Sequence, residues 1–141
     1  MERFLNPPEL DITMTARHLR ILVVEDETLI RWSIAETLAQ EGHTVMEAAS
    51  AASAMKALED EEKEIDVVLL DYRLPDSNDL GLLAHVRRLQ PGSAVVMMTA
   101  YGTPEMTAGA LALGAYRVVG KPFDMRALES LVVEAHDARP H

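Results

Sequence analysis

The sequence predicts an α/β fold in which five parallel strands form one sheet with helices on both of its faces. Short runs of Val, Ile, Leu and Met recur five times, and each is followed by a segment with helical periodicity. The runs are apolar at consecutive positions, as strands buried on both faces require. Strict alternation of strand and helix indicates parallel strands joined by right-handed crossovers.

The first repeat pairs a strand over 21–24 with a helix over 28–41. The helix is expected because apolar residues recur every four positions, and Gly42 suits the left-handed conformation that ends many helices. The apolar side of this helix is formed by Ile30, Ile34 and Leu38. Trp32 lies off that side, and we expect it to be partly exposed near the start of the helix. It would lie at the edge of the core or contact a partner, and we favour the core edge.

The second repeat is a weaker strand over 43–47, followed by a helix for which Ser50 is a good N-cap. The inward residues of that helix are Ala51, Ala54, Met55 and Leu58. The third repeat has the most apolar strand, over 65–70, and Asp71 ends it. A loop rich in turn-forming residues leads to the next helix, which the Pro-Gly pair at 91–92 stops. Its inward residues are Leu82, Leu83, Val86 and Leu89.

The fourth repeat is a strand over 94–98 and a helix that Thr103 caps and Gly114 ends. The fifth is a strand over 116–119 and a final helix capped by Asp124. The inward residues of the final helix are Leu128, Leu131, Val132 and Ala135, at the spacing of one helical face.

Five such repeats favour a flavodoxin-like three-layer sandwich with strand order 2-1-3-4-5. Ligands of such sheets bind at the carboxyl ends of the strands, near the first and third strands, where the order reverses. We expect this domain over 20–137. Residues 1–19 are expected to form a flexible extension, because Pro7 and Pro8 exclude a helix there, and 138–141 a short tail.

Composition excludes several classes of function. The chain of 141 residues has a formal net charge of -10 and one adjacent basic pair, Arg87-Arg88, so we expect no binding to nucleic acid. It has no cysteine, and therefore no disulfide or thiolate metal site. No apolar run reaches the length of a membrane span, and the first residues lack the apolar core of a secretory signal. We expect a cytoplasmic location.

Polar residues stand where four of the five predicted strands end: Glu25 and Asp26, Asp71, Thr99, and Lys121. Each alone is most simply a cap or turn residue. Together they would meet at the carboxyl edge of the sheet, which favours a shared site. Three carboxylates can hold a hard divalent cation such as Mg²⁺, while the lysine and the hydroxyl can stabilise a phosphoryl group. Asp71 is then a candidate phosphate acceptor.

The strings VVEDE, LLDYRLPD, MMTA and GKPFD resemble the receiver domain of two-component response regulators, over about residues 20–137. The strings IRW and KPFD look most like the nitrogen-regulation class of enhancer-binding transcription activators. The resemblance implies a phosphorylation-dependent signalling switch. Asp71 would take a phosphoryl group from a histidine of a partner sensor kinase.

The resemblance also implies a metal site for Mg²⁺. Asp26 and Asp71 would bind the ion directly, Glu25 would act largely through water, and the backbone carbonyl of Arg73 would be a further ligand.

The same resemblance gives roles to two residues that face the phosphoryl group. Thr99 would hydrogen-bond to it and move toward it on activation, and Lys121 would form an ion pair with it. The bond between Lys121 and Pro122 would be cis.

Two positions depart from the family pattern. Asp79 stands where the family usually has Gly, and we expect it to be the N-cap of the third helix. Val118 stands where the family usually has Tyr or Phe. Tyr116 has the same strand parity as Val118, so both side chains are expected on one face of the sheet. We hypothesise that phosphorylation is read out through the Thr99 loop and the helix over 104–113, with Tyr101 as an alternative reporter.

Other functions remain open at this point. A pseudo-receiver would act as a protein-interaction module without phosphorylation, but it would be expected to lack acidic or lysine positions of the site. A phosphatase would need an acid–base residue where this chain has Arg73. We therefore expect a signalling domain, not an enzyme, that catalyses only its own phosphorylation and dephosphorylation. An output domain or a homodimer would use the 104–137 face, and the chain is either a stand-alone receiver or part of a longer activator.

Overall fold

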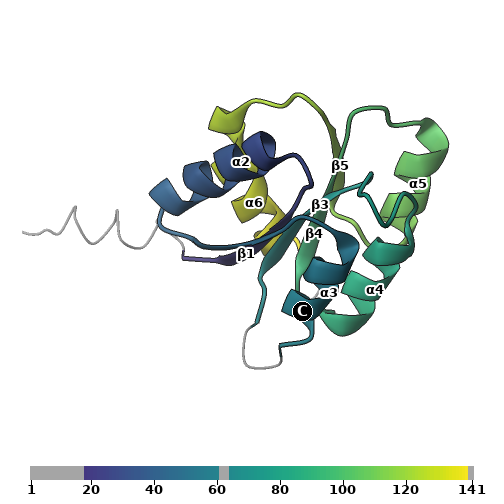
Figure 1. The fold of residues 1–141 in the computed structure, drawn as a ribbon, viewed down its shortest axis with the longest axis horizontal. Coiled ribbons are helices and arrows are strands. Elements are labelled where there is room, and N and C mark those ends of the chain that lie inside the picture. The colour runs from purple at the N-terminus through teal and green to yellow at the C-terminus, as the bar shows by residue number, and fades with distance from the viewer. Residues whose placement is uncertain (1–17, 61–63, 140–141) are drawn as a thin grey trace, which may run out of the picture.

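The computed structural model describes residues 18–60 and 64–139 and contains a five-stranded parallel sheet in the order β2-β1-β3-β4-β5 (Figure 1). The predicted fold class and strand order are confirmed. The strands are β1 (Arg20–Val24), β2 (Thr44–Ala48), β3 (Val67–Asp71), β4 (Ala94–Thr99) and β5 (Arg117–Gly120).

Helices cover both faces of the sheet and make three layers (Figure 1). One face carries α2 (Thr28–Gln40) and α6 (Leu128–Asp137), the latter preceded by a 3-10 turn over Met125–Ala127. The other face carries α3 (Ala51–Leu58), α4 (Gly81–Leu89) and α5 (Pro104–Ala112). None of the helices in the described ranges is long and apolar enough to cross a membrane.

The core has two halves, one on each face of the sheet, because strand side chains alternate in direction. Every residue of β3 is buried. Val68 and Leu70 of β3 pack in the half covered by α3, α4 and α5, whereas Val67 and Leu69 pack against α2 and α6. The continuous apolar run is therefore explained by burial of both faces of the central strand.

The predicted helix ends are largely confirmed. Ser50 caps α3 through a reciprocal pair of bonds with Ser53, and Thr103 caps α5 by accepting from the backbone N–H of Met106. Gly42 and Gly114 follow helices with φ of 95° and 104°, values that favour glycine over residues with a Cβ.

Two predicted caps are displaced. The N-cap of α4 is Leu80, while the Asp79 carboxylate accepts from the N–H of Gly81 at 2.8 Å. Asp124 caps the 3-10 turn that leads into α6, not α6 itself, through the N–H of Arg126. Asp79 therefore binds the first N–H group of α4 from one residue before the N-cap, and Asp124 binds an N–H group of the turn that precedes α6.

Two apolar side chains predicted near the core are exposed. Trp32 is 56% exposed, because it lies on the outer side of α2, away from the Ile34 side. Leu89 is 39% exposed, because it is the last residue of α4 and borders a hollow shared with Leu58 and Glu59. The prediction of an inward Leu89 was wrong. Trp32 is partly exposed, as expected, but it packs in neither half of the core, so the favoured position at the core edge is not confirmed.

A buried histidine joins three segments at the amino end of the sheet. The Nδ1 atom of His43 accepts from the backbone N–H of Leu19 at 3.0 Å, so its proton lies on Nε2, which contacts Oε1 of Glu129 at 2.6 Å. Leu19 is itself buried in the core. The predicted extension over 1–19 otherwise falls on residues outside the described part, except for His18, so its flexibility stays a prediction.

His43→Leu is expected to lower the free energy of unfolding by about 2 kcal/mol, because the buried Leu19 N–H loses its acceptor. Urea unfolding followed by circular dichroism measures the change. Glu129→Gln is the matched control, since its amide oxygen can still accept from His43 and the loss should be smaller. Equal stability of His43→Leu and the unaltered chain would contradict this account.

Candidate functional site

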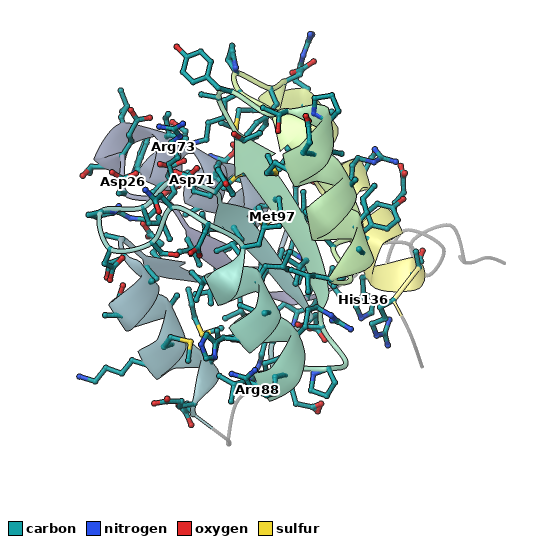
Figure 2. The ribbon with its side chains drawn as sticks, turned by 90° about the vertical axis from the view of Figure 1, so that its right-hand side faces the viewer. Asp26, Asp71, Arg73, Arg88, Met97 and His136 are labelled. Atoms are coloured by element: carbon teal, nitrogen blue, oxygen red, sulfur yellow. The ribbon has the colours of Figure 1, made fainter. Side chains whose placement is uncertain are left out.

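Four strand ends bring the predicted polar residues to one edge of the sheet. Asp71 and Thr99 are the last residues of β3 and β4, Lys121 follows β5, and Glu25 and Asp26 follow β1. Figure 2 places Asp26 and Asp71 beside Arg73, at the end of the molecule away from Arg88 and His136. A hollow of about 230 Å³ opens there, lined by Asp26, Glu27, Asp71, Arg73, Ala100 and Lys121.

Two buried carboxylates share one ammonium group at the floor of this site. Glu25 is fully buried and Asp71 is 6% exposed. The Nζ atom of Lys121 lies 2.5 Å from Oε1 of Glu25 and 3.1 Å from Oδ2 of Asp71. Buried charges need such partners, since an unpaired carboxylate in a protein interior is costly.

The carboxylates of Glu25, Asp26 and Asp71 could share a cation, because each offers an oxygen within 4.8 Å of the others. Both oxygens of Glu25 are already engaged, one by Lys121 and one by the backbone N–H of Glu27 at 3.0 Å. Asp26, in contrast, is exposed. Oxygen ligands of this kind suit Mg²⁺, which keeps several waters when bound. The acidic cluster is therefore compatible with magnesium.

Burial, and after it the negative charge of Glu25, raise the pKa of Asp71 from 3.8 to about 6 against the opposing effect of Lys121. Burial alone would lower the pKa of Lys121, but hydrogen bonds and charges from Glu25 and Asp71 raise it above the usual value. The metal-free site thus holds a lysine that stays protonated and a carboxyl group that titrates near neutral pH.

Asp71→Asn is expected to stabilise the metal-free fold by about 1–3 kcal/mol at neutral pH, since one pKa unit corresponds to about 1.4 kcal/mol. The folded chain binds a proton at Asp71 more tightly than the unfolded chain does. The free energy of unfolding of the unaltered chain therefore falls as the pH rises from the ordinary pKa of 3.8 through about 6. Below 3.8 Asp71 is protonated in both the folded and the unfolded chain, and this loss is absent. Thermal unfolding in the presence of a chelator measures the difference, which should vanish near about pH 4. A constant difference at all pH values would argue against the raised pKa.

Thr99 ends β4 and pairs with Gly120 of β5, the residue before Lys121. It is buried, its hydroxyl accepts from the backbone N–H of Tyr101 at 3.2 Å, and its carbonyl accepts from the backbone N–H of Lys121 at 2.8 Å. Arg73 lies on the loop after Asp71 and donates its backbone N–H to Oδ1 of Asp71 at 3.3 Å. The bond between Lys121 and Pro122 is cis, as the family resemblance implied.

Val118 and Tyr116 lie on opposite faces of the sheet, so the parity prediction was wrong. Val118 packs in the core half that faces α5, whereas Tyr116 packs in the half that faces α6. Tyr116 precedes β5, which starts at Arg117, and strand alternation does not extend to it. On the α5 side, Thr99 and Val118 instead border an open groove of about 690 Å³. Tyr101 is 79% exposed in the loop beside it.

Two residues of the site were missed from the sequence. Glu27 contributes its backbone N–H to Glu25, and Arg31 donates from Nη1 to the carbonyl oxygen of Glu25 at 2.7 Å. Backbone donors have no sequence signature. Arg31 lies six positions after Glu25, a spacing that becomes a contact only because the turn after β1 folds the start of α2 back over the strand end.

Taken together, a parallel sheet in this order and an acidic pocket with one lysine at its switch point define a class of signalling domain. The pattern of the response regulator receiver domain family matches residues 21–133, and the chain belongs to this family.

Individual proteins similar to this chain are also response regulators or receiver domain proteins. The chain is 35% identical over 119 residues to a putative NtrX-like response regulator of Rickettsia conorii, covering 83% of this chain and 25% of that protein. It is 30% identical over 115 residues to the DNA-binding transcriptional regulator NtrC of Azospirillum brasilense, covering 82% and 24%. The chain thus spans about a quarter of the length of these relatives. A CheY-like receiver domain protein from Methanospirillum hungatei has a similar structure, with a TM-score of 0.80, 32% identity, and coverage of 86% and 95%.

Proposed function

We propose that this chain is a phosphorylation-dependent switch whose Asp71 accepts a phosphoryl group from a histidine of a partner kinase. The observation that carries the proposal is the position of Asp71. It is nearly buried at the floor of an open hollow, with Lys121 3.1 Å away and the exposed Asp26 on the rim. A carboxylate so placed can be reached by a phosphoryl donor from one side only.

In the proposed reaction a carboxylate oxygen of Asp71 forms a bond to phosphorus, and the bond from phosphorus to the histidine nitrogen of the kinase breaks. The electron pair returns to the imidazole, which can take up a proton, and Asp71 becomes an acyl phosphate. Lys121 is held by Glu25 beside the acceptor, so its ammonium group would pair with the phosphoryl oxygens. Thr99 would supply a hydroxyl to the same group.

The residues that would hold Mg²⁺ are Asp26 and Asp71 directly, Glu25 through water, and Arg73 through its backbone carbonyl. The engagement of both Glu25 oxygens by Lys121 and Glu27 supports an indirect role for Glu25. When bound, Mg²⁺ supplies positive charge that offsets the charge on the transferring phosphoryl group.

The response would leave the site through Thr99. Its hydroxyl oxygen accepts from the Tyr101 N–H, and its O–H would donate to the phosphoryl group. Movement of Thr99 toward that group would shift the loop that leads to α5. The receiving face would comprise α5, β5 and α6, toward an output domain or a second copy. The name of the NtrC relative supports a place in transcription regulation. From the receiver domain family we infer a sensor histidine kinase as partner and a cytoplasmic location.

The proposal is tested with acetyl phosphate, a small-molecule phosphoryl donor, by electrophoresis in a gel that retards phosphoproteins. A retarded band is expected with Mg²⁺ and not with excess chelator, and it should disappear on treatment with hydroxylamine, which cleaves acyl phosphates. Absence of any retarded band would favour the pseudo-receiver, an interaction module that works without phosphorylation.

Asp26→Ala is expected to weaken Mg²⁺ binding by about tenfold or more, from an affinity in the micromolar-to-millimolar range, because the exposed carboxylate is a proposed direct ligand. Isothermal titration calorimetry measures the dissociation constant. Glu36→Ala is the matched control, since Glu36 is an exposed carboxylate of α2 that does not line the hollow. An unchanged titration for Asp26→Ala would refute the metal role of Asp26.

A further inference from the structure

The side chain of Arg31 on α2 contacts the peptide bond between Glu25 and Asp26, the two acidic residues that follow β1. Its Nη1 atom donates to the carbonyl oxygen of Glu25 at 2.7 Å, and its Nε atom donates to Oε1 of Glu47 on β2 at 3.1 Å. The Arg31 side chain is 17% exposed and that of Glu47 is 45% exposed. The guanidinium thus ties the turn after β1 to the neighbouring strand.

We propose that Arg31 is a positioning residue for the metal site, holding the Glu25–Asp26 peptide so that Asp26 stays turned to the hollow. The inference rests on the proposed function, because it assigns Arg31 a part in the same Mg²⁺ site. The carbonyl of Glu25 belongs to the peptide plane that joins the two residues. Rotation of that plane would move the Asp26 carboxylate.

The backbone hydrogen bonds on either side of this turn do not involve the carbonyl oxygen of Glu25, which accepts from Arg31. The backbone N–H of Glu25 donates to the carbonyl of Ala48 at 3.0 Å, which fixes the strand side. The backbone N–H of Arg31 donates to Glu27 at 2.9 Å and closes the first turn of α2. Between these fixed ends, the backbone N–H of Glu27 donates to the side chain of Glu25, whereas Arg31 donates to the carbonyl of the Glu25–Asp26 peptide itself.

Glu47 has a distinct part, because a free guanidinium beside exposed acidic groups would be drawn to the Asp26 carboxylate. The ion pair with Glu47 directs the fork of Arg31 toward the backbone carbonyl instead. Arginine suits this place since its planar group donates in two fixed directions at once, which lysine cannot do.

A purely electrostatic role of Arg31 predicts the opposite result from a positioning role. A positive charge near the site repels Mg²⁺, so its removal would strengthen metal binding. Loss of a positioning bond loosens the ligand and weakens binding. Arg31→Lys separates the two further, because it keeps the charge and loses the fork.

The test measures Mg²⁺ binding calorimetrically for Arg31→Met, Arg31→Lys and Glu47→Gln, well below their unfolding temperatures. Both Arg31 variants are expected to raise the dissociation constant by about tenfold, in line with losses seen for residues that orient metal ligands. Glu47→Gln should raise it by about threefold, since the ion pair is half exposed. Phosphorylation of Arg31→Met by acetyl phosphate should recover to nearly the unaltered rate at saturating Mg²⁺, a recovery that general destabilisation would not give.

Arg87→Met is the matched control, because Arg87 also clamps backbone carbonyls, those of Pro91 and Ser93, before β4 at the opposite end of the sheet. It should leave the Mg²⁺ dissociation constant unchanged. Tighter binding by Arg31→Met, or unchanged binding by both Arg31 variants, would overturn the positioning role. If the unaltered chain neither binds Mg²⁺ nor becomes phosphorylated, the proposed function fails instead, and the two failures are distinct.

Discussion

Asp71→Asn is expected to abolish transfer of a phosphoryl group from acetyl phosphate to this chain. The asparagine amide keeps the size of the side chain but lacks the negatively charged oxygen that attacks phosphorus. Asp71 is the acceptor to which Lys121 is already paired, at 3.1 Å. Phosphoprotein-retarding electrophoresis of the two chains under identical conditions measures the loss.

The control is Asp79→Asn in the same loop. Asp79 accepts from the N–H of Gly81 through one oxygen, and asparagine can preserve that bond. Phosphorylation of this variant should match that of the unaltered chain. Persistent phosphorylation of Asp71→Asn would falsify the assignment of the acceptor. A measured gain in stability of that variant would exclude misfolding as a cause of lost labelling.

Lys121→Met is expected to lower the free energy of unfolding of the metal-free chain by about 2–4 kcal/mol at neutral pH, as removal of one partner of a buried ion pair does. The fully buried Glu25 and the nearly buried Asp71 would lose their shared ammonium. Loss of its positive charge also removes an effect that lowers the pKa of Asp71. The defect should therefore shrink as the pH falls and Asp71 takes up a proton.

Mg²⁺ should raise the unfolding temperature of Lys121→Met more than that of the unaltered chain, because the ion replaces the missing positive charge. Phosphorylation should nevertheless stay slower by about a hundredfold, a loss typical when one stabilising donor is removed. Lys56→Met, at an exposed position of α3, is the control and should change neither property. A Lys121→Met chain as stable as the control would contradict the account of the buried carboxylates.

The fold could be predicted from the sequence because its burial pattern is simple. Runs such as Val67 to Leu70 are buried on both faces, and only a central parallel strand needs that pattern. The site followed from topology, since parallel strands deliver Asp71, Thr99 and Lys121 to one edge. These residues are close in space because β3, β4 and β5 are neighbours in the sheet. The strict alternation of strands and helices along the sequence was enough to suggest that strand order.

The errors concern places where local rules stop applying. Tyr116 lies just outside β5, where strand alternation does not determine side-chain direction. Leu89 is the last residue of α4 and lies beyond the part of the helix whose side chains are buried against the sheet. Arg31 donates to a backbone carbonyl, and because every residue type offers such an acceptor, the contact can be found only from the path of the turn.

The central claim, that Asp71 accepts a phosphoryl group, is tested most directly by intact-mass spectrometry with peptide mapping after incubation with acetyl phosphate and Mg²⁺. The account predicts a gain of one phosphoryl group, dependent on Mg²⁺ and located on the peptide that contains Asp71. An unchanged mass, or a phosphoryl group on any other residue, would contradict it.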